Sequence, residues 1–256
     1  MMTGAAGLWG QCPSFVFPHL VNGSGWRSSL YLVNESATSP VNYTLSFRGD
    51  GALPLLMPFA DGRRDNQISG TIAAGGVAIL DTSGLDSDPL IAGSATLSTS
   101  GTVSGFTVFR EKQAGQPDRE ATAPLSKTAA RGLVFPFDNT GGFDSSVALT
   151  VVCGPNPTVV LTAIATDEAG ATLGQAEVKV TRGGHAAFMA GGEIPGTKGK
   201  QGLIRVGVAG PLGASVQLAG LGLRYSRSGA LTYFPPSAWT FGAASYGVRP
   251  RSRAKK

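Results

Sequence analysis

The two halves of the 256-residue chain carry the same short motifs in the same order. Each copy opens with Phe-Pro, continues through a turn rich in Asn and Gly to an aromatic residue, and then carries a pair of serines. In chain order, the matched segments are 17–26 (FPHLVNGSGW) with 135–143 (FPFDNTGGF), 28–29 with 145–146, 73–80 with 181–188, and 103–109 with 218–224. Ordered repetition of this kind is typical of a chain that contains one structural unit twice. We therefore predict two copies of one domain.

Each copy is rich in short segments whose apolar residues recur at every second position. Residues 41–47 (VNYTLSF) are the clearest case, because a strand with one buried face must alternate in this way. The predicted strands are 30–33, 41–47, 77–80, 94–99 and 104–110 in the first copy, and 147–152, 159–166, 176–180, 186–189, 203–208 and 216–225 in the second. Since no window has a helical period, the sequence predicts an all-β chain of two tandem immunoglobulin-like β-sandwich domains.

The domain boundaries follow from the composition between the repeats. Residues 115–131 are mostly small and polar, so we expect the chain to leave one domain and enter the next there. The predicted organisation is an N-terminal segment (1–14), a first sandwich (15–118), a linker (119–131), a second sandwich (132–236) and a C-terminal segment with a basic tail (237–256).

The positive charge of the chain is concentrated in that tail. The sequence has 21 Lys and Arg against 16 Asp and Glu, and the last eight residues hold Arg249, Arg251, Arg253, Lys255 and Lys256. Without these five the counts are equal, so the body of the chain is neutral. A nucleic-acid-binding domain carries its basic residues clustered on the fold itself. We therefore do not expect nucleic acid as the main partner, and we interpret the tail as a solvated end.

Composition favours a location outside the cytoplasm. Only 14% of the residues are charged, while 42% are hydrophobic and 37 are Gly. Soluble domains average about 25% charged residues, and low charge with many Gly, Ser and Thr is common in secreted β proteins. No apolar run is long enough to cross a bilayer. The first residues lack the pattern of a secretory signal, so either the protein is cytoplasmic or its native start lies upstream. We expect an extracellular or cell-surface protein.

The chain has two cysteines, Cys12 and Cys153, one in each half. A disulfide between them is possible, but it would join the segment before the first strand to the second domain. That geometry is demanding, because bridged residues need their Cα atoms within about 7 Å. We expect the two thiols to be unpaired.

The repeat motifs resemble a family of poorly characterised sandwich modules found in extracellular proteins of environmental bacteria. The resemblance rests on the Phe-Pro opening, the Asn/Gly turn before Trp26 or Phe143 with the strand that follows it, and the closing motif that starts at Gly105 (GFTVFR) or Gly220 (GLGLRY). It covers residues 15–236. It implies a secreted, immunoglobulin-like, non-catalytic module, and it carries over no catalytic residue.

Nothing in the sequence predicts catalysis. The only histidines are His19 and His185, which the repeat aligns with Phe137 and Val77. No nucleophile elbow, metal-binding pair, phosphate loop or carboxylate pair accompanies either of them. We therefore predict a protein that is not an enzyme, with no catalytic residue, no metal and no cofactor. A hydrolase whose site assembles only in space stays a third hypothesis.

The repeated turn supplies the candidate binding residues. Trp26 and Phe143 end the two turns and would stack on a ligand ring if exposed, while Asn22, Asp138 and Asn139 would bind its polar groups. The competing interpretation, which we favour, is that the aromatic residues close the end of each sandwich. The leading hypothesis is a non-catalytic binding, adhesion or spacer protein whose partner is an unknown protein or polysaccharide at the cell surface. The alternative is a carbohydrate-binding accessory module of a polysaccharide-degrading system.

Overall fold

The computed structural model describes residues 12–112, 115, 117–127, 130–208, 215–226 and 229–239. The first half contains β1 (Phe15–Asn22), β2 (Trp26–Asn34), β3 (Val41–Arg48), β4 (Met57–Pro58), β5 (Arg64–Asp65), β6 (Gln67–Ile72), β7 (Val77–Asp81), β8 (Ile91–Thr99), β9 (Val103–Glu111), β10 (Arg119–Pro124) and β11 (Ser126–Lys127). The second half contains β12 (Gly132–Asp138), β13 (Phe143–Cys153), β14 (Thr158–Asp167), β15 (Thr172–Thr181), β16 (His185–Met189), α1 (Ala190–Glu193), the 3-10 turn η1 (Pro195–Thr197), β17 (Gln201–Gly207), β18 (Gln217–Ser226), β19 (Leu231–Phe234) and β20 (Ser237–Ala238).

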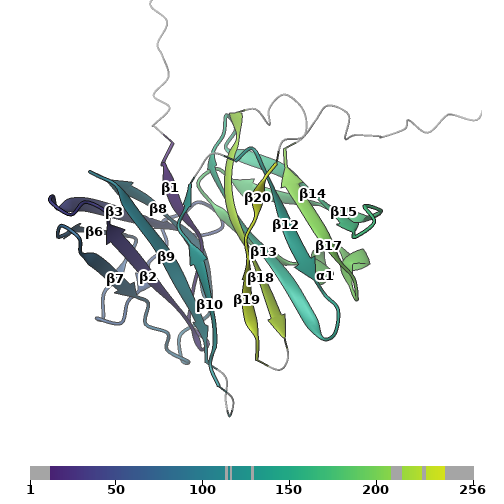
Figure 1. The fold of residues 1–256 in the computed structure, drawn as a ribbon, viewed down its shortest axis with the longest axis horizontal. Helices are drawn as coiled ribbons and strands as arrows, with labels where there is room; N and C mark the ends of the chain where they lie inside the picture. Colours follow the sequence, from purple (N-terminus) through teal and green to yellow (C-terminus); the bar gives the residue numbers. More distant parts are fainter. Residues whose placement is uncertain are drawn as a thin grey trace, which may run out of the picture.

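The chain is all-β and its strands form several antiparallel sheets (Figure 1). Sheet I has the order β11-β1-β8-β3-β6 and sheet II the order β10-β9-β2-β7; a small pair, β4 and β5, lies beside them. Sheet III has the order β20-β12-β17-β14-β15 and sheet IV the order β19-β18-β13-β16. Apart from the β4–β5 pair, the strands of the two halves therefore follow the same order in their sheets.

Each half has its own hydrophobic core. Sheets I and II share a cluster of buried side chains that includes Phe17, Leu30 and Leu45. Sheets III and IV share a second cluster that includes Phe135, Leu149 and Leu161. These residues come from alternate positions of their strands, as expected where one face of each sheet is turned toward a partner sheet.

The predicted strands are confirmed, and the structure adds strands that the sequence did not predict. Both Phe-Pro motifs lie inside strands, β1 and β12, rather than before them. The segment expected to be a linker contains β10 and β11. β10 pairs with β9 along its full length, from Arg119 opposite Glu111 to Pro124 opposite Phe106. Its proline is tolerated because β10 is the edge strand of sheet II.

The two halves are packed against each other through an apolar junction (Figure 1). The open side of the first half, formed by β1, β9 and β10, meets the outer face of sheet IV. The buried residues of this contact are Val21, Phe109, Ala121 and Ala123 from the first half, and Ala148, Leu221, Leu223 and Leu231 from the second. A smaller cluster of Val16, Val152 and Ala219 extends it.

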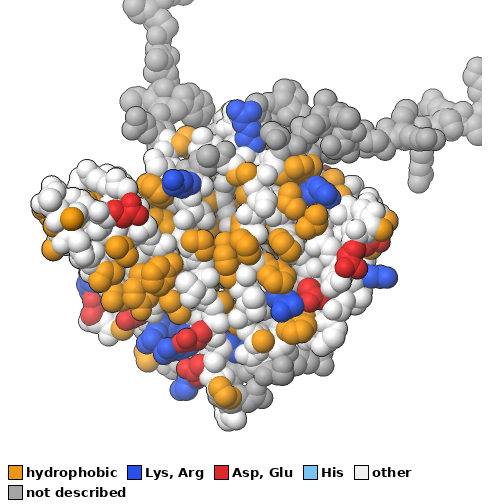
Figure 2. Space-filling view, viewed as in Figure 1, with side chains coloured by type: hydrophobic (Ala, Val, Ile, Leu, Met, Phe, Trp, Pro, Cys, Tyr) orange, Lys and Arg blue, Asp and Glu red, His pale blue; other side chains and the backbone are white. Residues whose placement is uncertain are grey.

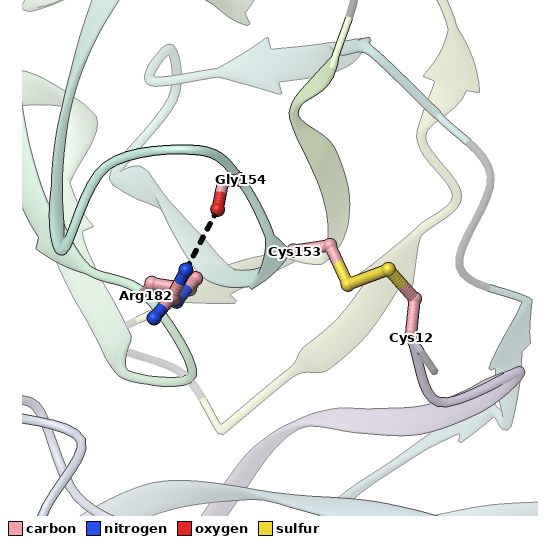
Figure 3. Close-up of a disulfide and its surroundings, with 4 residues drawn as sticks. All are labelled: Cys12, Cys153, Gly154 and Arg182. Atoms are coloured by element: carbon pink, nitrogen blue, oxygen red, sulfur yellow. Dashed lines mark hydrogen bonds between the residues drawn. A yellow bond between two sulfur atoms is a disulfide. The ribbon is translucent and has the colours of Figure 1, made fainter. Parts of the chain in front are cut away.

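A disulfide joins Cys12 to Cys153, so the expectation of unpaired thiols was wrong (Figure 3). Their Cα atoms are 5.9 Å apart, within the range that a disulfide spans. The prediction failed because it treated the halves as separate bodies. In the structure Val16 packs against Val152, which brings the residues just before β1 to the end of β13.

The helical elements α1 and η1 are short and follow β16. In the described part of the chain, no helix is long and apolar enough to span a membrane. The basic tail lies outside the described residues.

Candidate functional site

A pocket with a volume of about 570 Å³ lies at the border between the two halves. Its lining residues are Trp26, Glu111 and Arg119 from the first half, and Gly142, Phe143, Asp144, Met189, Tyr225 and Ser226 from the second. Trp26 and Phe143, which the repeat predicted as equivalent, therefore line one common pocket.

The turn between β1 and β2 places Trp26 at the pocket. Gly23 and Gly25 have positive φ values of 89° and 83°, a conformation that glycine adopts without steric cost. A side chain at position 23 would also collide with the Pro89 carbonyl, since a Cβ there would lie 2.1 Å from its oxygen. Gly23 and Trp26 exchange backbone hydrogen bonds of 3.0 Å that close this turn.

Asn22 is fully buried and does not reach the pocket. Its side-chain oxygen accepts hydrogen bonds from the Gly84 backbone N–H (2.8 Å) and the Ser83 hydroxyl (3.2 Å). It thereby ties the turn to the segment after β7. In this structure the Asn22 side chain makes these contacts within the fold.

Asp138 and Asn139 are also engaged inside the second half. Asn139 accepts a hydrogen bond from the Ser145 backbone N–H at 2.8 Å and is buried. Asp138 binds the Arg224 guanidinium at 2.6 Å and the Thr140 hydroxyl at 2.6 Å. Burial raises the pKa of Asp138, but these hydrogen bonds outweigh it and hold the pKa below its usual value. Of the five predicted binding residues, only Trp26 and Phe143 line the pocket.

The aromatic side chains of the pocket are fixed by neighbouring residues. The rings of Trp26 and Tyr225 meet edge to face with their centroids 6.3 Å apart. The guanidinium of Arg224 lies 4.1 Å from the centroid of Phe143, so a cation–π contact holds that ring. Tyr225 also accepts a hydrogen bond of 3.2 Å from Ser146, and burial raises the pKa of its hydroxyl.

The polar side of the pocket is built by Glu111 and Arg119, which face each other across β9 and β10. Glu111 Oε2 lies 3.4 Å from Arg119 Nη1. Glu111 Oε2 and Arg119 Nε are both buried and have no hydrogen-bond partner among the described residues. Burial raises the pKa of Glu111, and the charge of Arg119 opposes this effect. Buried polar atoms are nearly always hydrogen-bonded, so this pair is suited to a ligand that both donates and accepts.

Sequence reasoning missed Glu111, Arg119 and Tyr225. Arg119 lies in the segment expected to be a linker, and Glu111 follows the last residue of the predicted strand 104–110, so neither had a predicted orientation. Tyr225 ends a predicted strand, but its place beside Trp26 depends on how the halves pack.

The two histidines meet at the junction, away from the pocket. His185 Nδ1 lies 2.7 Å from Asp50 Oδ1, and His185 Nε2 lies 2.8 Å from His19 Nδ1. Because a carboxylate only accepts, His185 donates from Nδ1, and its Nε2 accepts the proton of His19 Nδ1. Burial and the neighbouring His185 lower the pKa of His19 to about 3. Burial also lowers the pKa of His185, against the opposing effect of Asp50.

This array contains a carboxylate that the sequence did not associate with either histidine. Within the described residues, neither imidazole is hydrogen-bonded to a Ser, Thr or Cys side chain. The nearby Thr150 hydroxyl donates to the Pro18 carbonyl at 3.1 Å. In the same part of the chain, no three His, Cys, Asp or Glu side chains gather at a point where they could hold a metal ion.

Comparison with known proteins finds no matching family, no matching curated protein and no matching solved structure.

Proposed function

We propose that the chain is a non-catalytic binding protein that takes its ligand in the pocket between its two halves and acts outside the cytoplasm. The observation that carries this proposal is the meeting of Trp26 and Phe143 in one pocket. Two equivalent turns from different halves supply an aromatic side chain each to the same space. Pockets that combine aromatic walls with a few polar groups are the usual sites for small ligands.

We propose further that each half is an immunoglobulin-like sandwich domain and that the two arose as copies of one unit. The identical strand orders and the two separate cores support this interpretation. So does a shared hydrogen-bond pattern: Ser28 exchanges two bonds with the backbone of Val21, and Ser145 exchanges two with Asp138. The same side chain closes the same turn in both halves.

The disulfide supports the proposed location at the cell surface or beyond it. Disulfides form and persist in oxidising compartments and are rare in the cytosol, where thiols are kept reduced. The disulfide between Cys12 and Cys153 therefore favours a location outside the cytoplasm. The adhesion or spacer role predicted from the sequence is compatible with the same location.

We propose that the protein is not an enzyme because its two histidines lie away from the pocket. His19 and His185 lie at the junction and not among the residues that line the pocket. Their lowered pKa values keep both imidazoles neutral at pH 7, and each is already hydrogen-bonded. A general base needs access to the proton it removes. The positions of the two histidines therefore support the non-catalytic proposal over the hydrolase hypothesis.

The second candidate function is carbohydrate binding, with a sugar as the ligand of this pocket. Within the part of the chain that the structure describes, Glu111 Oε2 accepts no hydrogen bond beyond its 3.4 Å ion-pair contact with Arg119, and Arg119 Nε has no acceptor. Both residues line the pocket together with Trp26. A hydroxyl group both donates and accepts, so neighbouring sugar hydroxyls would satisfy both atoms at once. The apolar face of the sugar ring would then lie on Trp26. This arrangement favours a neutral oligosaccharide over a charged ligand, because Glu111 and Arg119 already balance each other.

The test is to measure binding of the full chain to a panel of neutral oligosaccharides by titration calorimetry, comparing wild type with Trp26→Ala and Glu111→Gln. Removing the aromatic wall should weaken binding by about tenfold or more, as truncation of a central contact usually does. Glu111→Gln should weaken it as well, because one acceptor is exchanged for a donor.

The control is Leu53→Ala, an exposed large apolar residue that does not line the pocket. It should bind as wild type does. Binding that survives Trp26→Ala unchanged would exclude the pocket as the site. If no oligosaccharide binds but another small ligand does, and Trp26→Ala abolishes that binding, the carbohydrate candidate is wrong and the pocket stands.

A further inference from the structure

The outer face of sheet II carries a patch of apolar side chains that no described segment of the chain covers. It consists of Tyr31 and Val33 on β2, Val77 and Ile79 on β7, and Phe106 on β9, and we call it the β2–β7–β9 face. Val77 and Ile79 are each 51% exposed, although large apolar residues usually turn inward. Figure 2 shows hydrophobic side chains gathered over these strands.

The residues of this face form one continuous surface. In the strand register Tyr31 lies between Ile79 on one side and Phe106 on the other, and Val33 lies opposite Val77. The rings of Tyr31 and Phe106 are stacked, with their centroids 4.6 Å apart. None of these side chains is charged, and contiguous uncharged apolar patches on a surface mark interaction sites.

The same face of the second half is covered. By strand order and register, Ala148 corresponds to Tyr31, Thr150 to Val33 and Leu221 to Phe106. All three second-half residues are buried, because the open side of the first half lies on them. The Thr150 hydroxyl even donates to the backbone of β1. The outer face of sheet IV is therefore an interface within the chain, whereas the equivalent β2–β7–β9 face is exposed.

The corresponding open side of the second half is poorly suited to cover the β2–β7–β9 face of another molecule. In the first half, Val21 and Phe109 provide apolar contacts at the junction. Their counterparts by register are Asp138 and Arg224, which form an ion pair with a 2.6 Å contact. Placing that pair on an apolar face would remove charged groups from water, which is unfavourable. A head-to-tail chain of molecules is thus disfavoured, and the first-half side is already occupied.

We propose that the β2–β7–β9 face is a homodimer interface, on which a second copy of the chain places the same face. A two-fold axis makes such a contact self-complementary, because each apolar residue meets the apolar face of its partner. This inference does not depend on the pocket, which is lined by other residues.

The experiment is sedimentation of the full chain across a wide range of concentration, comparing wild type with Ile79→Lys and Val77→Lys. The wild type should dimerise as concentration rises. Each lysine should raise the dissociation constant by about a hundredfold or more, since a charge would be buried at the centre of the contact. Both positions are half exposed, so the thermal midpoint of the variants should stay that of the wild type.

The control is Leu90→Lys, an equally exposed leucine outside this face, which should dimerise as wild type does. Three results would overturn the proposal: a wild type that stays monomeric at every concentration, a dimer that persists in both Ile79→Lys and Val77→Lys, or open-ended oligomers that grow with concentration. The last result would indicate head-to-tail contacts.

Discussion

His19 owes its position to one extra residue in β1. Between Phe17 opposite Ala95 and Leu20 opposite Gly93, β1 has two residues where β8 has only Ser94, which is a β-bulge. β12 has no such shift against β17. The sequence-based alignment of position 19 with Phe137 was therefore wrong by one residue. The bulge turns His19 toward the second half, where it meets His185.

We predict that this histidine pair makes the fold sensitive to acid. The folded-state pKa values of both residues lie below the ordinary 6.5, and that of His19 is about 3. The unfolded chain therefore binds more protons than the folded one between pH 6.5 and 3. The stability that the neutral pair contributes is fully present above pH 6.5 and is lost as the pH falls. Each histidine adds up to about 1.4 kcal/mol per pH unit to this slope.

The measurement is chemical denaturation at several pH values for wild type and His19→Gln. The variant should lose less of its free energy of unfolding than the wild type does between neutral pH and pH 4. The carboxylates titrate in both proteins, so the difference between the two curves isolates the histidine. Identical acid slopes for the two proteins would refute the assignment.

At the scale of the strands, the sequence could predict those strands whose own residues alternate between apolar and polar. Residues 41–47 alternate because one face is buried and the other is not, and β3 forms there. β13 has buried residues on both faces at 147–152, since the first half covers its outer face. β10 was not predicted because its only alternating apolar residues are two alanines, Ala121 and Ala123. These alanines are buried by contact with the second half.

The same limit applies to the pocket. Trp26 and Phe143 were predictable as a pair because the repeat places them at equivalent turns. Glu111 and Arg119 were not, because their pairing arises from the register of β9 and β10. The disulfide was missed for the same physical reason, since contact between the halves leaves no periodic signal in the sequence.

We predict that the disulfide between Cys12 and Cys153 is a major contribution to stability. It closes a loop with a sequence separation of 141 residues, and long loops gain most from a cross-link because the unfolded chain loses most freedom. Replacing both cysteines by serine should lower the free energy of unfolding by roughly 2–5 kcal/mol. Denaturant titration of the variant and of the reduced wild type should give the same loss.

A direct check is to titrate thiols in the denatured, unreduced protein. The structure predicts that no thiol reacts until a reductant is added. Free thiols at a stoichiometry of two per chain would show that the bridge does not form in solution.

At the scale of the whole molecule, the junction between the halves is the organising feature. It buries an apolar cluster, holds the histidine pair, brings Cys12 to Cys153 and forms the wall of the pocket. Two halves with their own cores are thereby held in one arrangement. A ligand in the pocket would contact both at once, so its affinity depends on that arrangement.

Binding of one ligand between the two halves is tested most directly by nuclear magnetic resonance of the full chain during titration with candidate oligosaccharides. The indole signal of Trp26, identified by its loss in Trp26→Phe, should shift together with ring signals of Phe143 and Tyr225. The indole of Trp239, which lies against Arg205 and not in the pocket, serves as the internal reference and should stay in place. Shifts confined to one half, or a bound ligand that leaves Trp26 unmoved, would contradict the claim.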